Sequence, residues 1–343
     1  MIALISALTV LSTTAPPPAQ QISQAPEEDA SNIRVDAQTG EAAWEAVVSD
    51  GRNIRRYDVG RGRAVKPAKS KTPVRSPDWT KNQKAPLVNA LTEGGRWALQ
   101  VKGQEPASPS AASDLHGTVS PDRKSIAFIS GRSGQGDVYV TAANQSNQSP
   151  KRLSSTPLPE ALPTWSPDGK HLAYVRLTDR GRQLIILSGA DGSQSPQERV
   201  AADEREGTLF VAWRPDGKQL GFFGRDWSVG SAFYTVNPEL GGATKVLGDV
   251  EPQWNGPSWL PDGRGGWVTI LVRHGELLAI DSLGEQTVLQ TGAFGVSEVA
   301  AAVIKGRRTL VFSALGLTSD EKLTPRYRKV YTWVWPTEAA SAQ

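Results

Sequence analysis

Short apolar runs of four or five residues, separated by turn-forming residues, recur along most of the chain. Residues 125–129 and 219–223 are two of them, and each is followed by a second run, at 137–140 and 232–236. Runs of this length bounded by Gly, Pro, Asp and Ser predict β-strands rather than helices. We therefore expect an all-β chain whose central strands are buried between neighbouring sheets.

One turn motif precedes four of these runs at nearly constant spacing. Its clearest copy is Trp-Ser-Pro-Asp-Gly-Lys at residues 165–170, and its prolines, which lie 46, 48 and 46 residues apart, are Pro121, Pro167, Pro215 and Pro261. Proline presets φ for a turn, aspartate accepts a hydrogen bond from the backbone two residues on, and glycine tolerates positive φ. Each copy predicts a hairpin turn, and the repeat length is that of a propeller blade.

Each complete unit contains four predicted strands, the last of which follows a polar turn such as residues 188–192. Weaker units lie at residues 43–59, 77–101 and 303–335. The sequence predicts a β-propeller of six or seven four-stranded blades; seven is favoured, and six remains open if the first two units merge. Residues 33–35 are expected to form the outer strand of the last blade, because closing the ring removes exposed sheet edges.

The repeated Trp-Ser-Pro-Asp-Gly-Lys run followed by an apolar strand resembles the WD40-like repeat of TolB-type propellers. The resemblance is clearest from residue 114 to residue 280. It implies a propeller similar to those of the periplasmic Tol-Pal component and of prolyl-oligopeptidase-like peptidases. TolB proteins have an α/β domain before the propeller and the peptidases have a hydrolase domain after it. Too few residues flank the repeats here for either, so we expect a TolB-like propeller without the N-terminal domain.

Composition agrees with this fold, since 33 glycines, 24 prolines and 11 tryptophans suit many tight turns and wide apolar seams. The chain has no cysteine, which excludes disulfides, thiolate metal sites and thiol nucleophiles. The formal net charge is only +3, so the overall charge alone predicts no steering of an anionic partner.

The N-terminus resembles a signal peptide, because the apolar run 2–11 is too short to span a bilayer and is followed by small residues and prolines. A disordered cytoplasmic tail is the alternative. We expect a periplasmic or secreted protein with no transmembrane segment in the mature chain. Its predicted parts are a signal peptide (1–15), a flexible linker (16–32), a TolB-like propeller (33–337) and a C-terminal tail (338–343).

Residues 52–75 are strongly basic, with only Asp58 as an acid. The nine basic residues are Arg52, Arg55, Arg56, Arg61, Arg63, Lys66, Lys69, Lys71 and Arg75. Tyr57 is the only aromatic residue among them, and the series of interleaved aromatics that single-strand binders use for base stacking is missing, so a solvated loop is favoured and nucleic acid is not expected as a partner. Contact with an anionic lipid or a nucleic acid through this segment stays open as an alternative.

The sequence offers no catalytic motif. The three histidines, His116, His171 and His274, occupy different repeat positions and are not expected to converge. Residues 131–135 come nearest to a nucleophile elbow, but they lack its final glycine and precede no helix. We therefore predict that the chain is not an enzyme and has no catalytic residue, cofactor or metal. A propeller-type hydrolase or lyase with a metal at the central channel is the alternative.

One set of residues emerges when the repeats are superposed on the position before the turn. Five residues earlier lie Asp114, Glu160, Thr208, Trp254 and Glu298. In a propeller these positions begin the innermost strands, so we expect them to surround one mouth of the channel, where three carboxylates would attract a cation or a basic peptide. Alternatively, each carboxylate caps local backbone amides or pairs with an arginine of a neighbouring blade.

The tryptophans divide into two groups. Trp165, Trp213 and Trp259 recur at one repeat position, which predicts packing between blades, whereas Trp227 lies in the hairpin loop 225–228 and is a candidate contact. The predicted function is a non-enzymatic envelope or secreted scaffold that binds a protein or peptide, for example an envelope complex component, at one face of the ring. The predicted contacts are Asp114, Glu160, Glu298, Thr208, Trp254 and Trp227.

Overall fold

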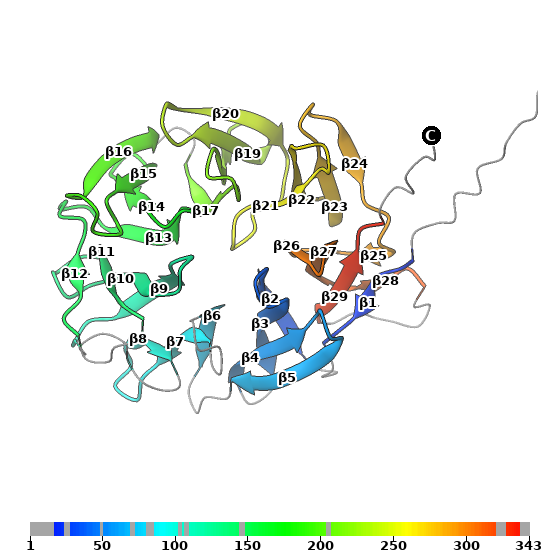
Figure 1. The fold of residues 1–343 in the computed structure, drawn as a ribbon, viewed down its shortest axis with the longest axis horizontal. Coiled ribbons are helices and arrows are strands. Elements are labelled where there is room, and N and C mark those ends of the chain that lie inside the picture. The colour runs from blue at the N-terminus through cyan, green and yellow to red at the C-terminus, as the bar shows by residue number, and fades with distance from the viewer. Residues whose placement is uncertain are drawn as a thin grey trace, which may run out of the picture.

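The protein is a seven-bladed β-propeller in which the blades surround a central channel (Figure 1). The structure is a computed structural model that describes residues 17–23, 28–48, 51–68, 73–79, 86–101, 105, 110–143, 148–203, 207–319 and 327–336. Every regular element in these ranges is a β-strand. The described residues contain no helix that is long and apolar enough to cross a membrane. The predicted all-β class and the predicted propeller are confirmed.

The first four blades follow the chain from the inner strand outward. Blade 1 contains β2 (Asp29–Asp36), β3 (Glu41–Val48), β4 (Gly51–Asp58) and β5 (Arg63–Ala68). Blade 2 contains β6 (Val74–Asp78), β7 (Leu87–Leu91) and β8 (Trp97–Val101). Blade 3 contains β9 (Asp114–Val119), β10 (Ser125–Ser130), β11 (Asp137–Ala142) and β12 (Lys151–Arg152). Blade 4 contains β13 (Glu160–Trp165), β14 (His171–Leu177), β15 (Arg182–Ser188) and β16 (Gln197–Ala202).

The last three blades complete the ring. Blade 5 contains β17 (Leu209–Trp213), β18 (Leu220–Asp226), β19 (Gly230–Asn237) and β20 (Gly241–Gly248). Blade 6 contains β21 (Ser258–Pro261), β22 (Trp267–Arg273), β23 (Glu276–Ile280) and β24 (Gln286–Val288). Blade 7 contains β26 (Glu298–Ile304), β27 (Arg307–Ala314), β29 (Lys329–Val334) and β1 (Gln20–Gln21). A separate small pair joins β25 (Ala293–Phe294) to β28 (Gly316–Leu317).

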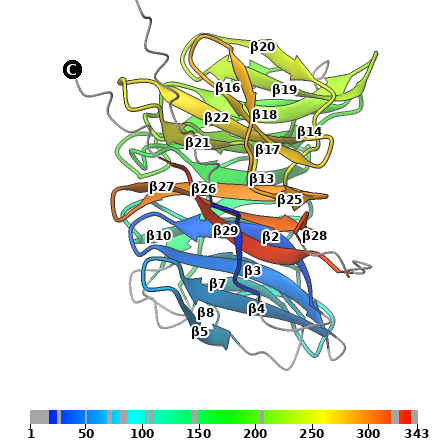
Figure 2. The ribbon, with the colours of Figure 1, turned by 90° about the vertical axis from the view of Figure 1, so that its right-hand side faces the viewer.

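The N-terminal part of the chain closes the ring, but not as predicted. Strand β1 pairs with β29, with Gln20 opposite Thr332, so β1 is the outer strand of blade 7. Residues 33–35 instead lie in β2, the innermost strand of blade 1. Figure 2 views the ring from the side where these two blades meet.

The predicted linker 16–32 also differs from the structure. This segment contains β1 and the start of β2. Its Ile22 and Ala30 side chains are buried in the core between blades 7 and 1, so its described residues are part of the propeller. The signal peptide predicted at 1–15 and the tail predicted at 338–343 lie outside the described residues.

The repeated turns have the predicted chemistry. The Oδ1 atom of the turn aspartate accepts a hydrogen bond from the amide two residues on in all four copies, over 2.7 to 3.1 Å. In the copy at Asp168, the following Gly169 has a φ of +73°. The turns thus set the spacing of the innermost and second strands in blades 3 to 6.

The seams between blades hold the repeated tryptophans. Trp165 and Trp213 are buried, and each indole donates a hydrogen bond of 3.2 Å to a carbonyl of the preceding blade, Thr118 and Thr164 respectively. Trp259 is buried against Gly221 of the preceding blade. The predicted packing role of these three residues is confirmed.

Candidate functional site

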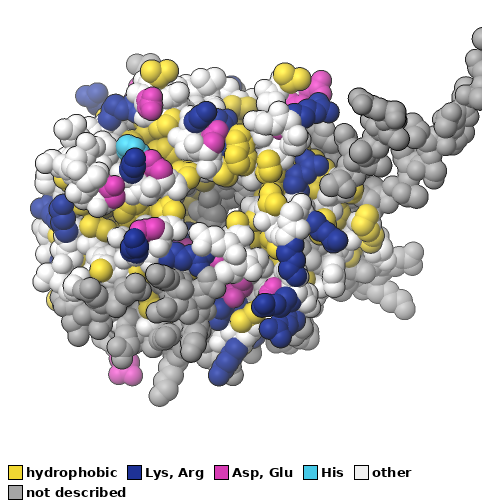
Figure 3. Space-filling view, in the orientation of Figure 1, with side chains coloured by type: hydrophobic (Ala, Val, Ile, Leu, Met, Phe, Trp, Pro, Cys, Tyr) yellow, Lys and Arg dark blue, Asp and Glu magenta, His cyan; other side chains and the backbone are white. Residues whose placement is uncertain are grey.

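The central channel is a cavity of about 870 Å³ lined by residues from all seven blades. Its lining includes, in blade order, Asn32, Ser76, His116, Leu162, Phe210, Asn255 and Ala300. Figure 3 shows one face of the ring, with hydrophobic side chains gathered near its centre and Lys and Arg spread towards its rim. The channel is therefore a mixed polar and apolar site assembled from segments that are far apart in the sequence.

Five innermost strands are bulged at the same level of the channel. Each pairing register shifts there, and a non-glycine residue adopts a φ between +46° and +55°: Asn32, Ser76, His116, Leu162 and Phe210. Bulges re-aim side chains, and a non-glycine residue at positive φ costs about 1 to 3 kcal/mol. The same backbone strain recurs at five places around one cavity, which makes these five side chains candidates for contact with a ligand.

Sequence reasoning missed this ring of bulges. The only signal is its repeat position, two residues after the predicted ring of Asp114 and its equivalents. Leucine and phenylalanine do not predict positive φ, whereas asparagine tolerates it. In blade 6, Gly256 has a φ of +74° and occupies the equivalent place before β21.

The predicted acidic mouth is not formed, because its carboxylates are at most 8% exposed and are bonded inside and between the blades. Asp114 accepts two hydrogen bonds from Arg132, of 2.9 and 3.1 Å. Glu160 accepts a 2.8 Å bond from Arg176 of its own blade and bonds to Ser154 and the Val138 amide of blade 3.

Glu298 links the two blades that close the ring. Its Oε2 atom accepts a 3.1 Å hydrogen bond from the Ile33 amide of blade 1. Burial raises the pKa of the Glu298 carboxyl to about 7. Thr208, at the corresponding position of blade 5, is fully buried. The alternative expectation is met only in part. The carboxylates do accept bonds from amides and arginines, but the arginines belong to their own blades and the amides to neighbouring blades.

Two of the predicted contact residues are exposed. Trp254 is 58% exposed, lines the channel and packs against Phe210 with ring centroids 4.8 Å apart. Trp227 is 81% exposed in the turn between β18 and β19, with the Arg225 guanidinium 4.5 Å from the centre of its ring. Both tryptophans lie at the end of blade 5 where β17 begins, so they belong to one face of the propeller.

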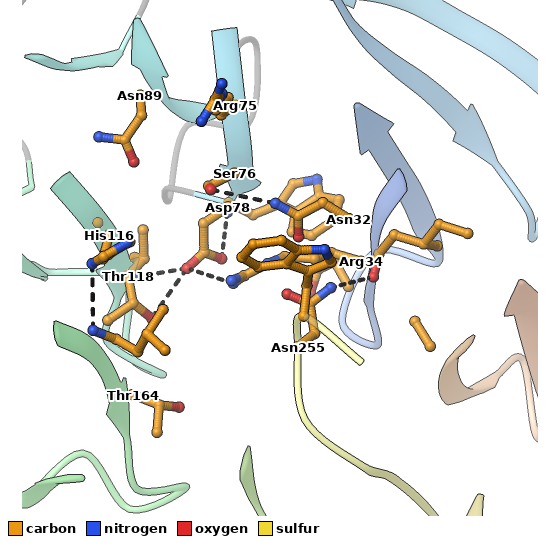
Figure 4. Close-up of a pocket in the computed structure, with 18 of the residues that line it drawn as sticks. Asn32, Arg34, Arg75, Ser76, Asp78, Asn89, His116, Thr118, Thr164 and Asn255 are labelled. Carbon is orange, nitrogen blue, oxygen red and sulfur yellow. Dashed lines mark hydrogen bonds and ion pairs between the residues drawn. The ribbon is translucent and has the colours of Figure 1, made fainter. Parts of the chain in front are cut away.

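Polar side chains cluster where blade 1 meets the segment before β21 (Figure 4). The Asn255 amide donates a 2.6 Å hydrogen bond to the Ile33 carbonyl, and the Asn32 amide donates one of 2.7 Å to Glu45. Within the described part of the chain, the Oδ1 atoms of both asparagines and Nε of Arg34 are buried without a hydrogen-bond partner. Since buried polar atoms are normally paired, this cluster has unused hydrogen-bonding capacity.

The histidines do not converge. His116 lines the channel, where its Nδ1 accepts a 3.4 Å hydrogen bond from the Leu162 amide, and burial lowers the pKa of its imidazole. His171 stacks against Trp213 in a blade seam, and His274 contacts Asp249 in blade 6 at 2.6 Å. Among the residues with described positions, no three His, Asp or Glu side chains are grouped to hold a metal ion.

The basic segment is not a solvated loop, because it forms β4, β5 and the start of β6. Four of its arginines form ion pairs with carboxylates: Arg52 with Glu45, Arg55 with Glu28, Arg56 with Glu41, and Arg61 with Asp58. Arg75 lines the channel, and Lys69 and Lys71 lie outside the described residues. The pairing leaves less free positive charge than the sequence suggested.

No protein-family model matches the chain. The Tol-Pal system protein TolB of Mannheimia succiniciproducens is 30% identical over 109 residues. That match covers 31% of this chain and 24% of the relative, so the chain spans about a quarter of the curated protein that it resembles.

Several solved structures share the fold, among them the following three. A puromycin-hydrolyzing peptidase of Mycobacterium tuberculosis gives a TM-score of 0.62 at 15% identity, over 88% of this chain and 53% of the peptidase. A protein of Agrobacterium tumefaciens assigned as TolB gives 0.51 at 14% identity, over 91% and 100%. An oligogalacturonate lyase of Vibrio parahaemolyticus gives 0.62 at 10% identity, over 91% and 92%.

The prediction that the chain is not an enzyme is contradicted by these comparisons, since propellers of the same shape occur in a peptidase and a lyase. The prediction relied on the absence of recognisable motifs, and a fold that hosts both binding proteins and enzymes cannot support that exclusion. The resemblance that the repeats predicted is nevertheless upheld by the match to TolB and by the shared ring. The chain is a β-propeller of seven blades, and part of its sequence is similar to TolB.

Proposed function

We propose that this propeller binds a protein or peptide partner at the channel mouth beside Trp254, in the cell envelope. One observation carries the proposal: an exposed tryptophan, supported by Phe210, stands at a cavity large enough for several side chains. Tryptophan is enriched among the residues that dominate binding energy in interfaces, because it buries a large area with little loss of conformational freedom.

Two further observations support a peptide ligand in this place. The bulged strands aim polar and apolar side chains at one space, and a peptide presents both kinds of group. The cluster of Asn32, Arg34 and Asn255 has donors and acceptors that a partner could use. An envelope location is supported by the apolar segment 2–11 and by the match to a protein of the Tol-Pal system.

Photo-crosslinking tests the proposal directly. p-Benzoylphenylalanine is placed at position 254, at position 227 on the same face, or at Val200 on the outer strand β16 as a control. After irradiation with an envelope fraction of the organism that encodes the chain, position 254 should give a discrete adduct that mass spectrometry identifies as a protein or peptide. Adducts at position 200 equal to those at 254 would contradict binding at the channel mouth.

A further inference from the structure

We propose that the segment entering the channel is acidic and that Arg34 and Arg75 bind its carboxylates. This inference rests on the proposed function and adds the chemistry of the partner. It reverses the sequence-based expectation, in which a ring of carboxylates would attract a basic peptide. The reversal follows from which charged groups of the channel are already bonded and which are not.

The acidic groups that line the channel are fully engaged. Asp78 accepts hydrogen bonds from the amides of Trp79 and Val119, both of 2.8 Å, and one of 3.3 Å from the Thr118 hydroxyl. These three bonds occupy both carboxylate oxygens of Asp78 with donors from blades 2 and 3. An incoming cation would have to displace them or share them.

The other two carboxylates are also engaged. Asp36 forms an ion pair with Arg123 at 2.7 Å and accepts further bonds from Gln38 and Thr39. Glu45 accepts bonds from Asn32, from the Ser76 amide at 2.9 Å and from Arg52 at 3.3 Å. The acids of the channel therefore act as links between blades and offer little to a ligand.

Two arginines of the same lining are not satisfied in this way. Arg34 forms one long ion pair, with Asp78, in which 3.7 Å separates Nη1 from Oδ2, so the contact is beyond hydrogen-bonding distance (Figure 4). Its Nε atom has no partner among the described residues, and its side chain is 31% exposed. Arg75 is exposed, with its guanidinium 4.8 Å above the Trp97 ring and no ion pair in the described ranges.

The charge balance points the same way. Four arginines (Arg34, Arg52, Arg75 and Arg123) and three carboxylates line the cavity, so its lining carries an excess positive charge. A guanidinium presents several donors in a plane that matches a carboxylate, and a cleft with an excess of one sign of charge attracts the opposite charge. An aspartate or glutamate side chain beside Trp254 fits this chemistry better than a lysine or arginine.

A random heptapeptide display library, selected on the full chain, tests the inference. Asp and Glu should be enriched at least threefold over Lys and Arg relative to the unselected library. For the best peptide, Arg34→Gln should weaken Kd about tenfold, and Arg75→Gln about threefold to fivefold because that side chain is exposed. The matched control Arg63→Gln removes the same charge from β5, outside the cavity lining, and should leave Kd within about twofold.

Arg34→Gln is first checked for an unchanged thermal midpoint, and Arg75→Gln provides an independent variant at an exposed position. Selected peptides without acidic enrichment, or with Kd values indifferent to both variants, would overturn the inference and leave the proposed function standing. A selection that enriches no peptide would instead count against the proposed function. Arg34-dependent binding of oligogalacturonate fragments, without peptide binding, would replace the acidic peptide with an acidic polysaccharide and overturn the proposal.

Discussion

Replacing Glu298 with glutamine is expected to change how the stability of the propeller depends on pH. Glu298 begins β26 and holds blade 7 to blade 1 through the Ile33 amide. Burial raises the pKa of this carboxyl from 4.5 to about 7. Glutamine keeps a carbonyl that can accept the same hydrogen bond but carries no titratable proton.

The sign and size of the effect follow from proton linkage. Between pH 4.5 and about 7 the folded protein retains the Glu298 proton, whereas the unfolded chain loses it. Stability contributed by this proton is therefore complete below pH 4.5 and falls as the pH rises to 7. At about 1.4 kcal/mol per unit of pKa difference, the free energy of unfolding should fall by about 3 kcal/mol over that window.

Urea denaturation followed by tryptophan fluorescence at pH 5, 6, 7 and 8 measures this fall. Glu298→Gln should lack it, so that the variant exceeds the wild type by about 3 kcal/mol at pH 8 and differs by less than about 1 kcal/mol at pH 5. Glu93→Gln, which neutralises an exposed carboxylate in the β7–β8 turn, serves as the control and should retain the wild-type pH dependence. Identical pH slopes for wild type and Glu298→Gln would refute the reasoning.

Two further substitutions test the packing between blades. Gly221→Ala should lower the free energy of unfolding by about 1 to 3 kcal/mol in urea titrations, because its Cβ would lie within 2.9 Å of Pro257, Trp259 and Phe233. Gly94→Ala, at a site where the nearest such atom is 3.9 Å away, should cost less than about 0.5 kcal/mol, and equal losses would contradict the account. Glu160→Ala leaves Arg176 buried with one fewer carboxylate and removes the bonds from Glu160 to Ser154 and Val138 of blade 3, so it should lower the free energy of unfolding by about 3 kcal/mol in the same assay. A loss under about 1 kcal/mol would contradict the stabilising role of this carboxylate in blade 4 and at its seam with blade 3.

The repeat made the fold predictable because one local rule recurs in four blades. A proline, an aspartate and a glycine fix each turn through contacts within a few residues, and the buried tryptophans such as Trp165 mark the seams at the same spacing. Short-range chemistry of this kind is readable from the sequence. Closure of the ring by an N-terminal strand was predicted, but not which residues form that strand, because β1 pairs with a strand about 310 residues later and its two residues carry no distinctive pattern.

The site was less predictable because its chemistry depends on contacts between blades. The repeat correctly placed Asp114 and Glu160 at the start of innermost strands. It did not predict the arginines that bond to these carboxylates within the blades. Positive φ at Leu162 and Phe210 is imposed by the bulged pairing rather than by residue type. Trp254 differs from its equivalents in the other blades in both respects: it is a tryptophan where three of them are carboxylates, and it is exposed where they are buried.

The central claim is that a protein or peptide partner binds at the channel mouth beside Trp254. Isothermal titration calorimetry of a selected peptide against wild type, Trp254→Ala and the outer-strand control Val200→Ala tests it most directly. Trp254→Ala should weaken Kd by at least about 30-fold, as expected for a dominant interface tryptophan, while the thermal midpoint and the Kd of Val200→Ala stay at the wild-type values. A Trp254→Ala variant that binds the peptide as tightly as the wild type would contradict the account.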